Sequence, residues 1–340
     1  MIIIGLLHTR LDPKLVSRAY LYSAIARNEG AHLYYFTSRD IDFSKKTIKG
    51  KYYRRGVWVA KEIRFPDVVI NVSGPNTPKQ RAIYNRLESM VPFTSHRVGN
   101  KMMVYNRLIK AKTFSAYVIP YQPIRSVDDI LPFLEKHQKI IIKPNAERHG
   151  NYIYYVEKTD DEYRFIYRNR EFRKKEEDAK DYMGMMLKDR PMLMQKYINS
   201  RRKTGEAYDF RLHVQKDGYG IWQNTAILPR VSQDERIITN LSQGAFLSIF
   251  ECFIQNEFSD RYRSMKFKIE GFALLLARHF DTIYNCEFDE LGIDIGIDED
   301  GKIWIYEVNW RPGHVYIEMK AARNAVDYAI YLVKKKTRED

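Results

Sequence analysis

The sequence predicts an α/β (α+β) protein, in which an open N-terminal α/β domain precedes two segments of mixed helices and strands. Two observations support this fold class. Short apolar strands alternate with helices over residues 1–95, as in open α/β domains. Near the C-terminus, two alternating apolar strands flank a turn rich in Asp and Gly, which is typical of a β-hairpin. We therefore divide the chain into segments 1–95, 96–190 and 191–340.

Periodicity and turn residues place the individual elements in order. The first segment is expected to hold strands over 2–7, 32–36 and 67–71, helices over 15–27 and 78–88, and a hairpin over 52–63 that turns at Arg55 and Gly56. The second should contain helices over 101–110 and 127–136 and strands over 139–143 and 152–156. The third should contain strands over 192–198, 208–214, 221–228 and 236–239, a helix over 262–279, the hairpin over 291–309 and a helix over 315–334.

Bulk composition is that of a globular protein with substantial cores. The chain has 340 residues, of which 44% are hydrophobic and 29% charged. Two cysteines, Cys252 and Cys286, provide neither a disulfide framework nor a metal-binding spacing, which fits a reducing cytoplasm. Residues 1–7 are too short for a signal peptide, and no apolar run is long enough to cross a bilayer, so we expect no membrane partner.

The charge balance points to an acidic partner. The net charge is +14, with 57 basic and 43 acidic residues, so a polyanion or an acidic small-molecule or peptide substrate is expected. Nucleic acid is the weaker alternative, because the basic residues are spread along the chain and no RNA-recognition or helix-turn-helix signature is present.

The C-terminal hairpin carries the strongest chemical signal. Side chains alternate along a strand, so Glu307 and Asn309 share one face. If Asp298 pairs with Ile303, Asp294 lies opposite Glu307 on the same face. Three oxygen ligands then converge, and such a set suits Mg²⁺ with nucleotide phosphates completing its coordination.

A solvated acidic hairpin is the competing interpretation of this segment. We apply it to the turn residues Asp298, Glu299 and Asp300. It does not suit Glu307, which interrupts a run too apolar for a solvent-facing strand.

Two further strands end in residues suited to a nucleotide. Lys143 closes an apolar strand just before Pro144, where its ammonium could bind a phosphate oxygen, although this pattern alone favours an ordinary strand end. The loop over 145–151 could close over phosphates. The exit of the strand over 192–198, comprising Gln195, Lys196, Tyr197 and Ile198, could offer backbone groups to an adenine edge.

Arginines near these strands need anionic partners. Arg211 stands among apolar residues on the face shared by Asp209 and His213, so it either binds an anion or pairs with Asp209 at the surface. Arg230 and Asn240, at the ends of later strands, could face the same pocket. Arg311 follows the metal-binding strand in a turn that places it beside the ion or serves structure alone. His314, in the same turn, is either catalytic or a packing residue.

Taken together and in this order, these motifs resemble the ATP-grasp superfamily. More narrowly, the phrases around Asp209, Asn240 and Asp294 resemble the YheC/YheD group, described as endospore-coat-associated proteins. The matching motifs are Gly99-Asn100-Lys101, Ile142-Lys143-Pro144, Gln195-Lys196-Tyr197-Ile198, Asp209-Phe210-Arg211, Asn240-Leu241-Ser242-Gln243-Gly244, Asp294 and Glu307-Val308-Asn309.

The resemblance implies a pre-ATP-grasp domain, followed by a small lid subdomain and a C-terminal subdomain that grip ATP. It assigns the phosphates to two lysines, the adenine pocket to the exit over 195–198, and Mg²⁺, for which Mn²⁺ could substitute, to the hairpin. Arginines would hold phosphate or substrate carboxylate. The implied residues are Lys101, Lys143, Gln195, Lys196, Tyr197, Ile198 and Asn240 for ATP, Asp294, Glu307 and Asn309 for the metal, and Arg211, Arg230 and Arg311 for catalysis.

Three functions are compatible with the resemblance. The first is a carboxylate–amine ligase that forms an acyl phosphate and releases ADP. The second is a non-catalytic, spore-coat-associated protein, which the unusual loop Ala146–Gly150 and the pair Gly244-Ala245, in place of a double glycine, would fit. The third is a small-molecule kinase. The protein would be cytoplasmic or spore-associated, and strand pairing through the N-terminal domain could give a homodimer.

Overall fold

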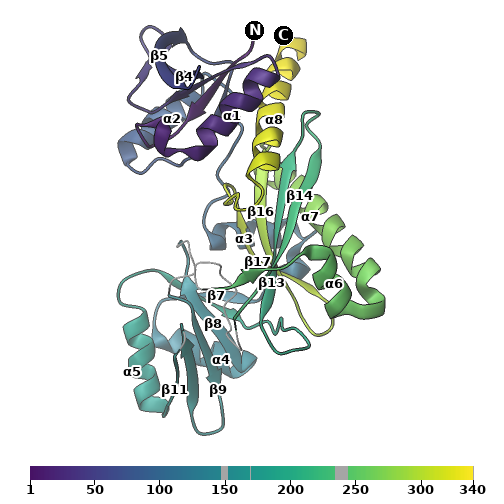
Figure 1. Cartoon of the computed structure of the whole chain (residues 1–340). Helices are drawn as coiled ribbons and strands as arrows, with labels where there is room; N and C mark the ends of the chain where they lie inside the picture. The colour runs from purple at the N-terminus through teal and green to yellow at the C-terminus, as the bar shows by residue number, and fades with distance from the viewer. Residues whose placement is uncertain (147–151, 169, 234–243, 340) are drawn as a thin grey trace.

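A computed structural model describes the whole chain except residues 147–151, 169, 234–243 and 340. Three β-sheets follow one another along the sequence, each with helices packed on it (Figure 1). This is the predicted mixture of α and β structure. No helix within the described ranges has both the length and the apolar character that spanning a bilayer requires.

The N-terminal sheet has the strand order β3-β4-β2-β1-β6, and β5 pairs with β4. Strand β1 runs parallel to both β2 and β6, as expected of an open α/β domain. The β4–β5 hairpin turns at Arg55 and Gly56, as predicted, with positive φ at both residues. The elements are β1 (Ile3–Leu7), α1 (Ser17–Asn28), β2 (His32–Phe36), β3 (Ile41–Asp42), β4 (Thr47–Arg54), β5 (Val57–Arg64), β6 (Val68–Asn71) and α2 (Pro78–Glu88).

The second sheet is antiparallel and has the order β11-β10-β9-β8-β12-β7. Helices α4 and α5 bury Ile130 and Met183 against Ile142 and Phe165 of this sheet. The elements are β7 (Tyr121–Ile124), α4 (Val127–His137), β8 (Lys139–Pro144), β9 (Tyr154–Lys158), β10 (Tyr163–Tyr167), β11 (Arg170–Lys174), α5 (Glu176–Met186) and β12 (Met192–Lys196).

The third sheet has the order β15-β14-β13-β16-β17 and carries the largest core. Helix α7 packs Phe272 and Leu276 against Leu212 and Ile293 of this sheet. The predicted strand over 236–239 lies outside the described residues. The elements are β13 (Tyr208–Lys216), β14 (Trp222–Val231), β15 (Phe246–Leu247), α6 (Phe250–Phe258), α7 (Tyr262–Tyr284), β16 (Glu290–Ile297), β17 (Ile303–Asn309) and α8 (Glu318–Glu339).

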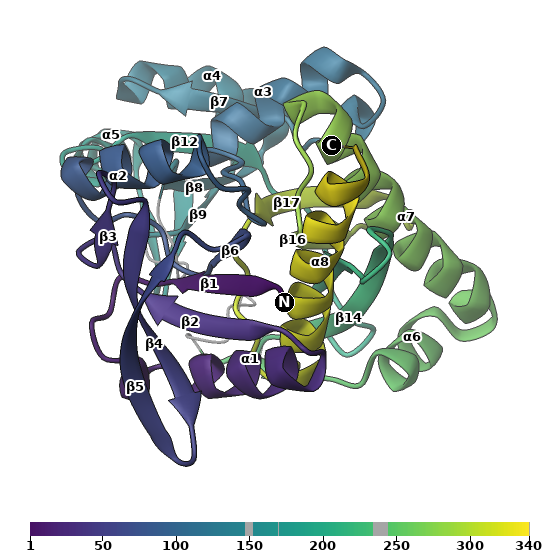
Figure 2. The same ribbon diagram turned by 90° about the horizontal axis from the view of Figure 1, so that it is seen from above.

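Packing crosses the bounds of the three predicted segments. Helix α3 (Lys101–Ala111) buries Tyr105 and Leu108 in the core of the third sheet. The last helix, α8, buries Val326 and Ala329 with Ile4 of the first sheet and lies beside α1 (Figures 1 and 2). Helices α3 and α8 therefore each pack against a sheet outside their own predicted segment. The division at residues 95 and 190 stays a prediction.

Candidate active-site cleft

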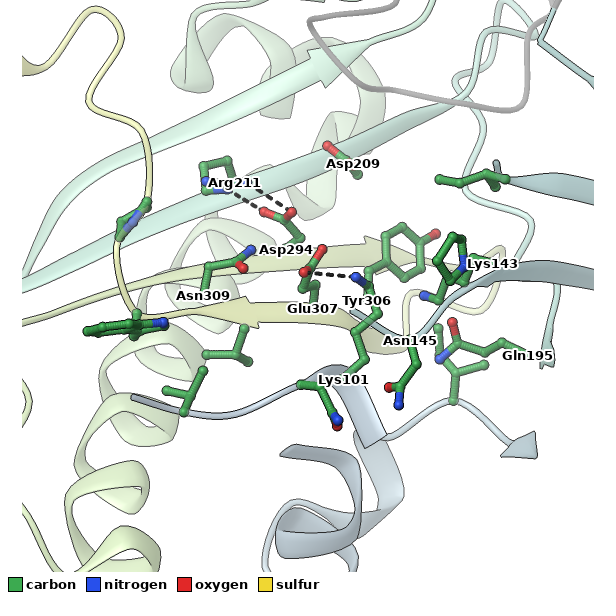
Figure 3. Close-up of a pocket in the computed structure, with 18 of the residues that line it drawn as sticks. Lys101, Lys143, Asn145, Gln195, Asp209, Arg211, Asp294, Tyr306, Glu307 and Asn309 are labelled. Atoms are coloured by element: carbon green, nitrogen blue, oxygen red, sulfur yellow. Dashed lines mark hydrogen bonds and ion pairs between the residues drawn. The ribbon is translucent and has the colours of Figure 1, made fainter. Parts of the chain in front are cut away.

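A cavity of about 1170 Å³ lies where the second and third sheets meet. It is lined by the N-terminal end of α3, the ends of β8 and β12, and the open faces of β13, β14, β16 and β17. Figure 3 shows the side chains from these elements pointing toward one another across the cavity. All the predicted site residues that lie in described parts of the chain line this cavity. The exception, Asn240, falls outside the described residues.

The register of the β16–β17 hairpin corrects one prediction. Ile303 pairs with Ile297 instead of Asp298, so the connecting loop is longer by one residue. A bulge between Asp294 and Ile295 then restores the predicted pairing of Asp294 with Glu307. The extra residue is Tyr306, and the two-residue alternation reverses there.

This bulge decides where Glu307 points. Ile303 and Ile305 face the core, so strict alternation would also turn Glu307 into the core. After the bulge, Val308 takes the core position instead, and Glu307 and Asn309 line the cleft. A carboxylate buried among apolar side chains would be costly, so the bulge makes this acidic residue compatible with the sheet.

Asp294, Glu307 and Asn309 lie near one another on adjacent strands of the same face (Figure 3). They offer two carboxylates and one amide oxygen, the donor types that Mg²⁺ prefers. The side chain of Glu307 is 28% exposed, and its Oε1 lies 3.2 Å from the Nζ of Lys101. The donor set therefore fits a hard divalent cation that also contacts a bound phosphate group.

A network of two arginines and two aspartates covers the wall of the cleft that β13, β14 and β16 form. Arg211 forms a bidentate pair with Asp294, in which its second nitrogen donates to Oδ2 at 3.0 Å. Arg230 donates twice to Asp209, at 2.6 Å each, and lies 3.2 Å from Asp294. The alternative pairing of Arg211 with Asp209 at the surface is wrong. Arg211 of β13 instead bonds Asp294 of β16, and Asp209 of β13 bonds Arg230 of β14.

These pairs keep Asp294 ionised. Burial acts to raise its pKa, but the positive charges of Arg211 and Arg230 outweigh that effect, and the pKa lies below its usual range. A carboxylate ligand must be deprotonated to bind a metal. The arginines therefore fix the orientation of this carboxylate and hold it in the deprotonated form that binding a cation would require.

Lys143 is the opposite case, because this buried lysine has no carboxylate within ion-pair distance among the described residues. Its Nζ lies 3.5 Å from the hydroxyl of Tyr105, which donates to the Tyr306 carbonyl at 2.5 Å. Burial, followed by repulsion from Lys101, lowers the pKa of Lys143 to about 7. An anionic ligand placed here would supply the missing negative charge.

Lys101 is positioned by the start of α3. Asn100 caps the helix, since its side chain accepts from the Met103 amide at 2.9 Å. Asn145, just beyond β8, adds a second restraint by accepting from the Met102 amide at 3.2 Å. The first turn of α3 is thereby tied to the end of the Lys143 strand, and both lysines face the hairpin from the other side of the cleft (Figure 3).

The exit of β12 forms an apolar end of the cavity. Ile198 packs with Ile119 and Trp304, and Gln195 is buried. The amides of Lys196 and Tyr197 donate to the carbonyls of Pro120 and Lys139. An adenine edge would therefore have to use other backbone groups of this segment.

Arg311 reaches the border with the first sheet. Its guanidinium stacks on Trp310 at 3.7 Å from the ring centroid and lies close to Gly74. It lines both the large cavity and a smaller neighbouring one. This position extends the cleft toward the N-terminal domain.

Residues at the cleft that the sequence did not indicate include Tyr306 and Asn145, which line the cavity, and the buried Tyr105, which contacts Lys143 from behind. Tyr105 follows Lys101 by four residues, so helical periodicity could have placed both on one face. Nothing in the sequence marks Tyr306, because its position depends on the bulge.

Comparison with known proteins identifies the family. The family model described as YheC/D like ATP-grasp matches residues 90–332. The chain belongs to this family. The match includes α3, the two sheets that line the cleft, and the hairpin, so the predicted resemblance is confirmed at the level of both superfamily and group.

Two curated relatives come from Bacillus subtilis (strain 168). The endospore coat-associated protein YheD is 26% identical over 335 residues, covering 90% of this chain and 72% of the relative. The endospore coat-associated protein YheC is 22% identical over 291 residues, covering 82% of this chain and 80% of the relative.

Solved structures show the same fold at low sequence identity. A RiPP-associated ATP-grasp ligase from Chryseobacterium gregarium, in complex with ADP and a leader and core peptide, matches with a TM-score of 0.54 and 13% identity, covering 97% of both chains. N5-carboxyaminoimidazole synthetase from Staphylococcus aureus matches with a TM-score of 0.54 and 11% identity, covering 96% of this chain and 77% of the other. The ATP-grasp fold is thereby confirmed.

Proposed function

We propose that this protein is an ATP- and Mg²⁺-dependent ligase that joins a carboxylate to an amine through an acyl phosphate. The observation that carries the proposal is the arrangement of the cleft, in which Lys101 and Lys143 face the oxygen donors Asp294, Glu307 and Asn309. Phosphoryl transfer depends on positioning and charge neutralisation more than on a protein nucleophile. The cleft offers charges of both signs and has no need of such a nucleophile.

Each set of residues has a distinct task in this reaction. Lys101 and Lys143 bind the ATP phosphates, and the apolar end at Ile198, with Gln195, Lys196 and Tyr197, takes the adenine. Asp294, Glu307 and Asn309 would hold Mg²⁺ or Mn²⁺, which when bound neutralises phosphate charge. Asn240, outside the described residues, is assigned to ATP on the family resemblance alone.

The reaction has two balanced steps. A carboxylate oxygen of the substrate attacks the γ-phosphorus, the bond from phosphorus to the β–γ bridging oxygen breaks, and ADP leaves. An amine nitrogen then attacks the acyl carbon, the bond from carbon to the phosphate oxygen breaks, and the nitrogen loses a proton as phosphate departs. Arg211 and Arg230 stabilise the charge of the transferring group, and Arg311 orients the substrate carboxylate.

The substrate class is an acidic small molecule or peptide. The net charge of +14 attracts anions, and one structural neighbour is described with a bound leader and core peptide. The names of the two relatives favour a second candidate, a coat-associated protein without catalysis. A small-molecule kinase is the third. We place the protein in the cytoplasm or with the spore.

The test measures ADP release from Mg-ATP with pooled amino acids, peptides and small carboxylates, and uses hydroxylamine to trap an acyl phosphate. Carboxylate-dependent ADP and a hydroxamate are expected, and both should disappear in Glu307→Gln. Asp300→Asn is the matched control, because this exposed acid lies at the tip of the same hairpin and outside the cleft. ADP without hydroxamate would favour a kinase, and ATP binding without ADP release would favour the coat-associated role.

A further inference from the structure

A buried cluster of two histidines and one glutamate lies beside the cleft and has no part in the proposed reaction. His213 comes from β13, Glu290 is the first residue of β16, and His314 follows β17 in the turn that carries Arg311. The three are 0%, 8% and 3% exposed, respectively. Three separate segments therefore deliver nitrogen and oxygen ligands to one point inside the protein.

The spacing of the ligand atoms fits a metal ion. The Oε2 atom of Glu290 lies 2.9 Å from the Nε2 of His314 and 3.4 Å from the Nε2 of His213. All three ligand atoms lie within 4.8 Å of one another. Tetrahedral zinc with bonds near 2.0–2.1 Å separates its ligand atoms by about 3.3 Å, so both shorter distances lie close to this value.

The hydrogen bonds of the cluster leave His213 unsatisfied. His314 and the side chain of Gln215 both contact the Glu290 carboxylate, at 2.9 and 3.3 Å. Among the described residues neither ring nitrogen of His213 has a partner with hydrogen-bond geometry, and its Nε2 is left with only the long 3.4 Å contact to Glu290, although the side chain is fully buried. A buried polar atom without a partner costs free energy, and an ion between the imidazoles and the carboxylate would satisfy the Nε2.

A second cavity of about 300 Å³ borders the cluster at Glu290. It lies between the N-terminal domain and the third sheet and is lined by Glu290 and by Pro312 and Gly313, the two residues before His314. Water or a small ligand could reach the ion from this side. Three protein ligands with a fourth position left for water or another small ligand is the arrangement of catalytic zinc sites.

We propose that His213, Glu290 and His314 bind a transition-metal ion of the Zn²⁺ class, separate from the oxygen-ligand site in the cleft. Imidazole nitrogens favour such ions, whereas Mg²⁺ favours the oxygens of Asp294, Glu307 and Asn309. The ion ties the turn that carries Arg311 to β13 and β16. The proposal rests on this cluster alone and does not depend on the ligase activity.

The experiment titrates metal-free, tag-free protein with Co²⁺ and Zn²⁺ in the presence of excess Mg²⁺, which occupies the oxygen site. We expect about one Co²⁺ per chain, with the intense visible absorption of a low-coordinate site containing imidazole, and displacement of Co²⁺ by Zn²⁺. Zn²⁺ should also raise the Tm. Affinity should fall at least about tenfold in His314→Ala and in His213→Ala, since even weaker perturbations of a site cost this much.

Two variants separate this site from others. Glu307→Gln should keep the Co²⁺ spectrum and stoichiometry, because it alters the cleft alone. His279→Ala, which removes a histidine of α7, should also keep both. His314→Gln replaces a ligand with a similar polar side chain and serves as the additional ligand variant, in case His213→Ala fails to fold. Absence of Co²⁺ binding in the unmodified chain, binding unchanged in the folded His314 variants, or binding lost in Glu307→Gln would each overturn the proposal.

Discussion

The two walls of the cleft carry charge in different ways. On the wall formed by β13, β14 and β16, two arginines and two aspartates bond one another within the protein. On the wall formed by α3 and β8, Lys143 is buried beside a hydroxyl and, among the described residues, has no carboxylate within ion-pair distance. The charges of the first wall pair within the protein, whereas Lys143 on the second wall would gain a counter-charge only from an anionic ligand.

This difference separates stability from function. Breaking a buried ion pair leaves one charge uncompensated and destabilises the fold, so the arginine wall should show its importance in unfolding experiments. An unpaired buried lysine already costs free energy in the free protein. Its removal should therefore stabilise the fold and damage ligand binding. Four predictions test this contrast, beginning with the largest effect.

The largest effect is expected for Arg230→Met. The change leaves the buried Asp209 carboxylate without its two hydrogen bonds of 2.6 Å. The free energy of unfolding should fall by about 3–5 kcal/mol, as measured by denaturant titration. The double variant Arg230→Met/Asp209→Asn should recover part of the loss, because it removes the orphaned charge. A single variant as stable as the parent would show that this wall is not held by its ion pairs.

Lys143→Met should have the opposite signature. Loss of the cation should lower kcat/KM for ATP by about 10²–10³-fold, the usual cost of removing one electrostatic contact to a transferring group. The Tm of the free protein should rise, since methionine has no charge to bury. Lys110→Met, near the end of the same α3 helix that carries Lys101, is an exposed control and should alter neither quantity. A Tm below that of the parent would contradict the contrast between the walls.

The stabilisation by Lys143→Met should depend on pH in a defined direction. The folded pKa of about 7 lies below the value of about 10.4 in an unfolded chain. Between these values the unfolded state binds more protons, so the stability of the parent rises with pH. The advantage of the methionine variant should therefore be greatest at or below pH 7 and shrink toward pH 10. An advantage that grows with pH would contradict the depressed pKa.

The third prediction concerns nucleotide binding by the parent protein. Phosphate charge should raise the pKa of Lys143 above its free value of about 7, so ATP binding above pH 7 should take up a proton. Affinity should then fall by up to about tenfold per pH unit over the linked range. Calorimetry in buffers of different ionisation enthalpy measures this uptake. Lys143→Arg stays charged and should lack the uptake, whereas equal uptake in both proteins would assign it to another group.

The smallest effect is expected for Lys101→Met. The side chain of Lys101 is 10% exposed and that of its partner Glu307 is 28% exposed, so water reaches the pair from the carboxylate side and weakens it toward the range of about 0–1 kcal/mol of surface ion pairs. The free energy of unfolding should therefore change by less than about 1 kcal/mol, while affinity for ATP falls because a phosphate contact is lost. A loss of stability comparable to that of Arg230→Met would place Lys101 with the paired wall instead.

Much of the fold follows from local patterns in the sequence. The turn at Arg55 and Gly56, the helix beginning at Lys101 and the two strands of the C-terminal hairpin appear as predicted, because alternation, capping and turn residues act over a few positions. Residues 176–186 and 250–258 also form helices, for which we made no prediction. Burial against the rest of the molecule decides such elements, and a local pattern does not report it.

The sequence predicted which residues form the candidate site better than it predicted how these residues pair with one another. The residue types Asp294, Glu307 and Asn309 indicated an oxygen-ligand set, and the structure brings them together. The pairing of Arg211 with Asp294 was not predicted, because Asp209 is closer in sequence while Asp294 is closer in space. Assignment of these residues to ATP and metal binding stays a prediction until the variants are measured.

The sequence alone therefore determined the order of the motifs, the alternation of the strands and the kinds of ligand atoms available, since each depends on neighbouring residues. Tertiary structure decided the rest. The bulge at Tyr306 turns Glu307 into the cleft, the walls assign each arginine its carboxylate, and burial lowers the pKa of Lys143. The histidine cluster likewise forms only when β13, β16 and the turn after β17 meet. These features arise from atoms far apart in the chain, and distance in space, which sequence spacing does not encode, sets their energies.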